Sequence, residues 1–306
     1  MKSVSNRLRR ARPLLGTFVE ITAIGFVDEG SAARAVDAAF DAVALAHRLM
    51  SFHEGGSDVS RLNRDGARRC VDVHPWTYRV LAAATALQRS SRGRFDIAVA
   101  PAMQALRLLP TTDDTSPPVH NPCSLGDSSV ILLPNHRVRL RHPKTRIDIG
   151  GIAKGFAVDQ AVTVLRAHGL PGGLVNAGGD IAAFGAQPQR VDIRHPLDPM
   201  RSLSRVDLKE EALASSGPRL GTDGTSPHAG AAIVDPTTGR AVTEVVGATA
   251  RAHTCMMADA LTKPAMILAQ SSLPLLDRHG ASALLVLRNG ETYATSNWKE
   301  AADRAA

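Results

Sequence analysis

Residues 146–162, RIDIGGIAKGFAVDQAV, carry polar groups in a spacing that suits an anionic ligand. Asp148 follows a strand-like run, Gly150 and Gly151 come next, and Lys154 precedes a helical pattern. The glycines would let a ligand approach the backbone closely, and a helix start offers free N–H groups. Lys154 would add a cation suited to phosphate, and Asp148 could accept from a hydroxyl, an amine or a ring N–H. A tight strand-to-helix turn with a solvated lysine is an equally good interpretation of this stretch alone.

Several familiar motifs are absent from the sequence. The glycines of residues 146–162 fit neither the dinucleotide fingerprint G-x-G-x-x-G nor the P-loop G-x-x-x-x-G-K-[ST]. The chain also has no G-x-S-x-G elbow and no H-E-x-x-H helix. These absences argue against an unrelated α+β hydrolase.

Two further turns place polar side chains beside glycines. In NAGGD, residues 176–180, two glycines again permit close approach, and Asp180 could orient a neighbouring group. In DPTTGR, residues 235–240, Arg240 could contact a phosphate. For NAGGD, a glycine turn capped by aspartate is the simpler interpretation, and DPTTGR has the composition of a turn.

Asp259 and Thr262 would share one face of a helix at residues 256–269, because they lie three positions apart. Such an oxygen pair suits Mg²⁺, which takes few protein carboxylates and completes its shell with phosphate oxygens and water. An ordinary capped or solvated helix face remains the alternative.

The composition describes a globular protein with a basic surface. Of its 306 residues 44% are hydrophobic, and the net charge is +7, which favours an anionic ligand. No RRM, zinc-finger or basic-zipper pattern is present, so we expect no nucleic-acid partner. Three cysteines without C-x-x-C spacing argue against a disulfide framework or a zinc site. Without a signal-peptide core or a long apolar run, we expect a cytoplasmic protein without a membrane span.

The elements that must position these groups follow from periodicity and turn residues. Strands come in hairpins more often than in alternation with helices, which predicts an α+β fold with antiparallel sheet. We expect one domain over residues 1–306, with a basic N-terminal arm at 1–13 and a surface loop at 110–128. The expected helices are 31–50, 75–89, 156–168 and 256–269. The expected strands include 14–25, 146–150 and 231–242, a loop is expected at 215–230, and a final hairpin has its tip at 289–290.

Eight segments in one order give the sequence a family resemblance. They are LLGTFVEI, MSFHEGGSDVSRLN, GRFDIAVAP, DIGGIAKGFAVDQAV, LVNAGGDIAAFG, ASSGP, IVDPTTGRAV and TCMMADALTKPAMIL, and they span residues 14–268. In this order they resemble the FAD:protein FMN transferases, the ApbE family. The resemblance implies a T-fold-like α+β protein with antiparallel sheets and packed helices. It also implies metal-assisted transfer of FMN from FAD to a threonine or serine of an acceptor flavoprotein, with release of AMP.

The resemblance also implies which residues contact FAD. Asp148 and Lys154 match FAD-contacting positions of the glycine motif. Phe95 and Asp96 match a segment that lines the flavin or adenosine site. Phe52 stands where the family often has a tyrosine, so it keeps an aromatic face without the hydroxyl.

The implied metal site, for Mg²⁺, departs from the family pattern. Gly151 matches a position whose carbonyl helps to hold the metal, and Asp259 matches a metal-ligand aspartate. The pattern A-D-A-x-x-T puts a threonine where this chain has Lys263, and Thr262 comes one place early. A lysine beside a divalent cation is repulsive, so Lys263 is an alternative source of positive charge for the pyrophosphate.

The implied catalytic histidine is missing as well. Many family members have a histidine three residues before the aspartate of the D-P-x-T-G turn, and here that position is Ala232. A histidine can move a proton near neutral pH and alanine cannot. His228 is a weak substitute, so the sequence names no confident catalytic residue.

Two interpretations therefore stand. The chain is a flavin transferase with a divergent site, or it is an FAD- or nucleotide-binding relative with lost or weak transfer activity. The first expects AMP release that depends on Mg²⁺, and the second expects FAD binding that changes little with Mg²⁺.

Overall fold

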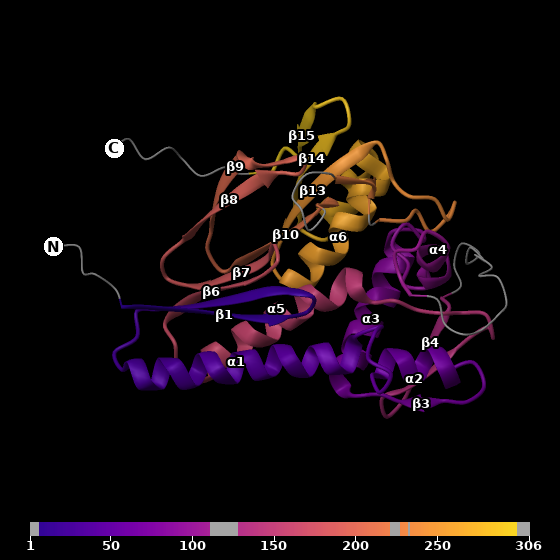
Figure 1. Ribbon diagram of the computed structural model, residues 1–306, viewed down its shortest axis with the longest axis horizontal. Helices are drawn as coiled ribbons and strands as arrows, with labels where there is room; N and C mark the ends of the chain where they lie inside the picture. The colour runs from indigo at the N-terminus through magenta and orange to yellow at the C-terminus, as the bar shows by residue number, and fades with distance from the viewer. Residues whose placement is uncertain (1–5, 111–127, 221–226, 232, 299–306) are drawn as a thin grey trace.

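The protein is described by a computed structural model that covers residues 6–110, 128–220, 227–231 and 233–298 (Figure 1). Its main sheet has eight strands in the order β1-β2-β6-β7-β10-β13-β14-β15, and every neighbouring pair is antiparallel. The strands are β1 (Arg7–Leu14), β2 (Thr17–Ile24), β6 (Gly172–Ala177), β7 (Asp180–Gly185), β10 (Glu211–Ser216), β13 (Val245–Ala252), β14 (Ser282–Leu287) and β15 (Thr292–Ala294). The α+β class with antiparallel sheets is confirmed.

Smaller antiparallel sheets accompany the main one. They contain β3 (Val71–Asp72), β4 (Val130–Leu133), β5 (Arg137–Leu140), β8 (Gln189–His195), β9 (Asp198–Leu208), β11 (Pro218–Leu220) and β12 (Pro227–Ala231). The β8–β9 hairpin packs on β7 and β10, because Val206 and Leu208 bury against Ile181 and Leu213. This hairpin therefore covers part of the main sheet.

Helices α1, α3 and α6 pack against α5, which lies between α1 and the sheet (Figure 1). The helices are α1 (Glu29–Met50), α2 (Asp58–Asp65), α3 (Pro75–Ser90), α4 (Ala100–Ala105), α5 (Gly150–Ala167), α6 (Cys255–Leu268) and α7 (Leu273–Arg278), with a 3₁₀ turn η1 (Ala269–Ser272). Contacts join α5 to α1, α6, β6 and β7. A helix surrounded in this way is apolar around most of its circumference, which explains the buried Phe156, Val158 and Leu165.

A glycine sets how closely α5 and α6 approach. A Cβ added at Gly155 would lie 2.2 Å from the backbone oxygen of Cys255, far inside van der Waals contact. No other residue fits without moving one helix away from the other. The G of the sequence AKGF is therefore a packing residue between the two helices.

Five sequence predictions differ from the observed elements. Residues 7–13 of the expected arm lie in β1, and residues 215–216, 218–220 and 227–230 of the expected loop lie in β10, β11 and β12. Residues 146–149 form no strand. Of the strand expected at 231–242, Ala231 ends β12, and a single β-bridge among residues 233–242 joins Val234 to Ala241. The helix expected at 156–168 begins six residues earlier, at Gly150. Most of the expected surface loop, residues 111–127, lies outside the described residues.

The missing strand at 146–149 has a physical cause. The amide of Asn63 in α2 takes the place of a strand partner: its Nδ2 donates to the carbonyl of Ile147 at 2.8 Å, and its Oδ1 accepts from the Ile147 N–H at 2.7 Å. The next N–H, of Asp148, donates to the carbonyl of Ile97 at 2.8 Å. A side chain therefore satisfies backbone groups that the alternating pattern assigned to a sheet.

None of the helices in the described part of the chain is long and apolar enough to cross a bilayer.

Candidate functional site

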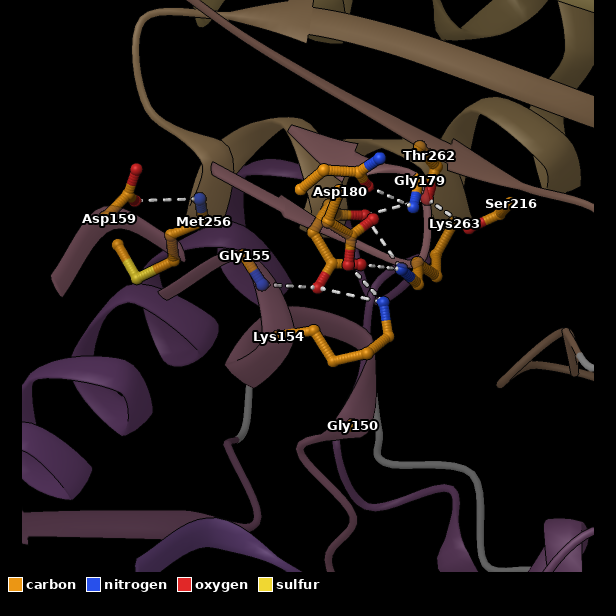
Figure 2. A network of polar contacts seen from close by, with 12 residues as sticks. Gly150, Lys154, Gly155, Asp159, Gly179, Asp180, Ser216, Met256, Thr262 and Lys263 are labelled. Atoms are coloured by element: carbon orange, nitrogen blue, oxygen red, sulfur yellow. Dashed lines mark hydrogen bonds and ion pairs between the residues drawn. The ribbon is translucent and has the colours of Figure 1, made fainter. Parts of the chain in front are cut away.

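Four charged side chains meet where α5, the β6–β7 turn and α6 come together (Figure 2). Lys154 of α5 pairs with Asp180, and its Nζ lies 3.9 Å from Oδ2 of Asp259 in α6. Lys263, one turn after Asp259, pairs with Oδ1 of that carboxylate. We call Lys154, Asp180, Asp259 and Lys263 the four-charge cluster. It holds two ammonium and two carboxylate groups.

The glycine turn between β6 and β7 fixes Asp180. Gly178 and Gly179 adopt φ of 63° and 102°, which favour glycine. A Cβ at Gly178 would lie 2.6 Å from Oγ1 of Thr17, and the Gly179 N–H donates to Oδ1 of Asn176 at 2.9 Å. Asp180 then starts β7 with only 1% of its surface exposed. The turn thus delivers a buried carboxylate to the cluster.

Asp259 is held from two helices. Its Oδ2 accepts the Gly155 N–H of α5 at 3.1 Å, and Asp259 itself is 1% exposed. The start of α6 is tied to α5 by Asp159, whose carboxylate accepts the N–H groups of Cys255 and Met256 at 2.8 and 2.9 Å. Burial raises the pKa of Asp159 to about 6, although these two N–H groups oppose the rise. The two helices therefore hold Asp259 beside Lys154.

The pKa values of the cluster reflect burial and mutual charge. Burial, then repulsion from Asp259, raises the pKa of Asp180 to about 6, against the attraction of Lys154. Burial alone would lower the pKa of Lys154, but the carboxylates of Asp259 and Asp180 outweigh it and raise that pKa. Burial would raise the pKa of Asp259, but the two ammonium groups outweigh it and lower that pKa. The two carboxylates therefore keep Lys154 charged at neutral pH.

Lys263 lies across the first turn of α5. Its Nζ also donates to the Asp259 carbonyl at 2.9 Å, and a Cβ added at Gly151 would lie 2.9 Å from its Cε. The structure thus brings together Gly151 and Asp259, two residues predicted to hold a metal, with the lysine side chain between them. Thr262, the third, instead lies within hydrogen-bonding distance of Ser216, with 2.8 Å between the two hydroxyl oxygens, and donates to the Asp259 carbonyl at 2.7 Å.

Asp148 lies at the entrance to α5, beside the four-charge cluster. The buried Ile147 and Ile149 flank it, and its Oδ2 accepts the Gly150 N–H at 3.3 Å. Burial raises the pKa of Asp148, while the charges of His53 and Lys263 act in the opposite direction. The carboxyl group therefore shares an electrostatic environment with the cluster.

Phe95 and Asp96, which were predicted to line the flavin or adenosine site, lie between α3 and α4. Phe95 is 4% exposed and packs in the core that includes Ile147 and Ile149, so its ring supports the site from within. Asp96 accepts from Gln88 Nε2 at 2.9 Å and from the Ala98 N–H at 2.8 Å. These contacts fix the loop between α3 and α4.

Phe52 and the D-P-T-T-G turn complete the sequence-predicted groups. Phe52 is half-buried against the same core. Arg94, just before Phe95, reaches Asp235 of the turn, with Nη1 3.5 Å from Oδ2. Ala232 lies outside the described residues, and the backbone of His228 is part of β12.

Sequence reasoning missed several residues of the site. Asp180 was noted only as an orienting group, and Ser216 and Asn63 were not singled out at all. The signal for Asp180 was its place directly after two glycines, but its partner Lys154 lies 26 residues away. Only the packing of β7 against α5 reveals that pairing.

A pocket of about 230 Å³ lies beside Ser216. The ends of β10, β13 and β14 and the turn of the β8–β9 hairpin surround it. It is lined by Arg194, His195, Pro196, Leu203, Ser215, Ser216, Gly217, Pro218, Gly247, Ala248, Thr249, Leu284 and Val286. Through Ser216 and Thr262 this pocket is connected to the helix that carries Asp259.

Comparison with known proteins gives one consistent result. A family model described as the ApbE family matches residues 15–285. The FAD:protein FMN transferase of Vibrio cholerae serotype O1 is 24% identical over 304 residues, which cover 94% of this chain and 90% of that protein. The FAD:protein FMN transferase of Treponema pallidum is 25% identical over 319 residues, covering 94% and 86%.

Solved structures share the fold. The ApbE protein of Thermotoga maritima matches with a TM-score of 0.82 at 24% identity, over 95% of this chain and 97% of that one. The flavin transferase ApbE of Vibrio cholerae matches with a TM-score of 0.78 at 24% identity, over 95% and 98%.

Proposed function

The chain belongs to the ApbE family, and we propose that it transfers the FMN part of FAD to a threonine or serine of an acceptor flavoprotein. Relatives that align with most of the chain carry the name FAD:protein FMN transferase, which supports this activity. In the reaction the acceptor oxygen bonds to the FMN phosphorus, and the bond from that phosphorus to the AMP oxygen breaks. AMP leaves with the electron pair of that bond, and the hydroxyl proton passes to solvent.

The four-charge cluster is the observation that carries this proposal. Phosphoryl transfer needs positioning and charge neutralisation more than covalent chemistry from the protein. Two buried carboxylates hold the ammonium groups of Lys154 and Lys263 beside the first turns of α5. The side chain of Lys154 is 36% exposed, so it can meet a pyrophosphate without leaving Asp180.

The remaining predicted residues shape the FAD site in this proposal. Asp148 accepts a hydrogen bond from the ligand at the mouth of α5, where Gly150 is exposed. Phe52 offers an apolar face to the ligand, and Asp96 lines the flavin or adenosine part of the site. Phe95 supports this part of the site from the core, because its ring is almost fully buried.

The arrangement of side chains does not fit the Mg²⁺ that the resemblance implies. Lys263 and the Gly155 N–H take the two carboxylate oxygens of Asp259, and Thr262 bonds to Ser216 and to the helix backbone. Over the described ranges, no group of three His, Cys, Asp or Glu side chains could hold a metal ion. We therefore derive no step through a metal.

The test uses the purified chain, FAD and an acceptor domain that carries the threonine motif of a covalent flavoprotein. We expect one AMP released, measured by chromatography, for each FMN found on the acceptor threonine by peptide mass spectrometry. AMP release without acceptor modification would reduce the activity to FAD hydrolysis and overturn the proposal.

A second function, FAD binding without transfer, has one observation in its favour. Ala232 stands where many family members have a histidine, so the chain lacks that acid–base group. In this case FAD would bind and stay intact, and the acceptor would remain unmodified under conditions in which an active relative modifies it.

A further inference from the structure

We propose that the ammonium group of Lys263 is a built-in cation that takes the place of a divalent metal, so that this chain binds FAD without one. The inference rests on the proposed function, because it concerns the charge that faces the pyrophosphate of FAD. Three features of the described residues carry it: the occupied oxygens of Asp259, the charge balance of the four-charge cluster, and the space beside Gly151.

The first feature is that every side-chain oxygen of Asp259 already has a donor. Oδ1 pairs with Lys263, and Oδ2 accepts the Gly155 N–H at 3.1 Å and lies 3.9 Å from Nζ of Lys154. The Asp259 carbonyl accepts from Nζ of Lys263 at 2.9 Å. A metal that bound Asp259 through Oδ1 or the backbone carbonyl would have to displace the ammonium group of Lys263 from that oxygen.

The second feature is the charge balance. Two ammonium groups face two carboxylates that are each 1% exposed, so the four formal charges cancel. A divalent cation at Asp259 would add two positive charges beside two lysines in a poorly solvated place, where repulsion is weakly screened. A threonine at position 263 would remove one ammonium and leave the cluster with a net negative charge, which attracts a metal.

The third feature is space. The Lys263 stem fills the gap between α6 and the first turn of α5, since a Cβ at Gly151 would lie 2.9 Å from its Cε. The contacts described for Nζ use two acceptors, and an ammonium group has three N–H donors. The third donor, on a side chain that is 15% exposed, is left for an anionic oxygen of the ligand.

The test compares FAD affinity, measured by quenching of flavin fluorescence, in EDTA and in MgCl₂. We expect the dissociation constant of the wild-type chain to differ less than twofold between the two conditions. For Lys263→Thr we expect at least tenfold weaker binding in EDTA and recovery of most of that loss in MgCl₂. Lys209→Thr is the matched control, because Lys209 is exposed and lies outside the four-charge cluster. This variant should behave like the wild type.

The wild-type comparison alone decides the inference, even if the variant does not fold. Wild-type binding that is lost in EDTA and restored by MgCl₂ would overturn the built-in cation and leave the proposed function standing. Absence of FAD binding in both conditions would instead overturn the proposed function, and the inference with it. A direct measurement of Mn²⁺ binding by electron paramagnetic resonance should find tight binding in Lys263→Thr and none in the wild type.

Discussion

At the scale of single residues, the pairing of buried charges fixes the arrangement of the site. Asp180 and Asp259 are nearly inaccessible to water, and an unpaired carboxylate there would be strongly destabilising. The ammonium groups of Lys154 and Lys263 form ion pairs with these two carboxylates. The ammonium groups are thus positioned before the ligand arrives, which is the preorganisation that charge stabilisation in phosphoryl transfer requires.

Lys154→Met tests this preorganisation. Methionine keeps the length of the side chain and removes its charge, so the ligand pyrophosphate loses one charge-assisted hydrogen bond. We expect the dissociation constant of FAD to rise about tenfold or more, as fits a bond worth about 1.5–3 kcal/mol. Lys209→Met is the matched control, and circular dichroism checks that both variants fold. Unchanged affinity in Lys154→Met would remove this residue from the FAD site.

Several of these residues could be named from the sequence, but not their partners. Glycines, an aspartate and a lysine in one segment identify Asp148 and Lys154 as possible ligand contacts. The pairing of Lys154 with Asp180 and of Lys263 with Asp259 depends on how α5, β7 and α6 pack. Lys263 stood out only as a departure from the family pattern, and the structure shows what it contacts.

At the scale of elements, two links between α5 and α6 hold the cluster in place. One is the close approach at Gly155, and the other is the carboxylate of Asp159 at the start of α6. Periodicity predicted α1, α3 and α6 to within two residues at each end, because apolar stripes and caps are local signals. The alternating pattern wrongly predicted a strand at residues 146–149. The side chain of Asn63, from α2, there satisfies the N–H and C=O groups of Ile147.

Gly155→Ala should separate the two helices. The new Cβ would overlap the Cys255 carbonyl, and backbone cannot move aside as a flexible side chain can. We expect a loss of about 3 kcal/mol in the free energy of unfolding, measured by urea denaturation. Gly55→Ala is the control, because a Cβ there meets nothing within 4 Å, and it should change stability by no more than about 0.5 kcal/mol. Equal stability of the two variants would contradict the packing role of Gly155.

Asp159→Ala tests the second link through its pH dependence. The pKa of Asp159 is about 6 in the folded chain, above its ordinary value of 3.8, which applies to the unfolded chain. The folded state therefore takes up a proton first as pH falls below 6, which stabilises it relative to the unfolded state. The difference in unfolding free energy between wild type and Asp159→Ala should thus grow by about 1 kcal/mol from pH 7 to pH 5. A difference that stays constant or shrinks would contradict the raised pKa.

At the scale of the whole molecule, the sequence predicted the class of fold but not its strand order. Hairpins and turn residues indicate antiparallel sheet, because adjacent strands joined by short turns pair locally. In the described part of the chain, α1 to α5 come between the sheet neighbours β2 and β6, and β10 lies between β7 and β13. Such long-range pairings depend on tertiary packing, which local sequence patterns do not report. The expectation of a single domain over residues 1–306 stays a prediction.

Transfer of FMN to an acceptor is tested most directly with the whole chain in cells. The chain is co-expressed with an FMN-acceptor domain that carries its threonine motif, beside a parallel culture with an active family relative. Flavin fluorescence of the acceptor band is read after denaturing electrophoresis, which retains only covalently bound flavin. We expect a fluorescent acceptor band that disappears when the acceptor threonine is replaced by alanine. A dark band beside a bright band from the relative would contradict transfer to that acceptor and leave FAD binding without transfer as the function.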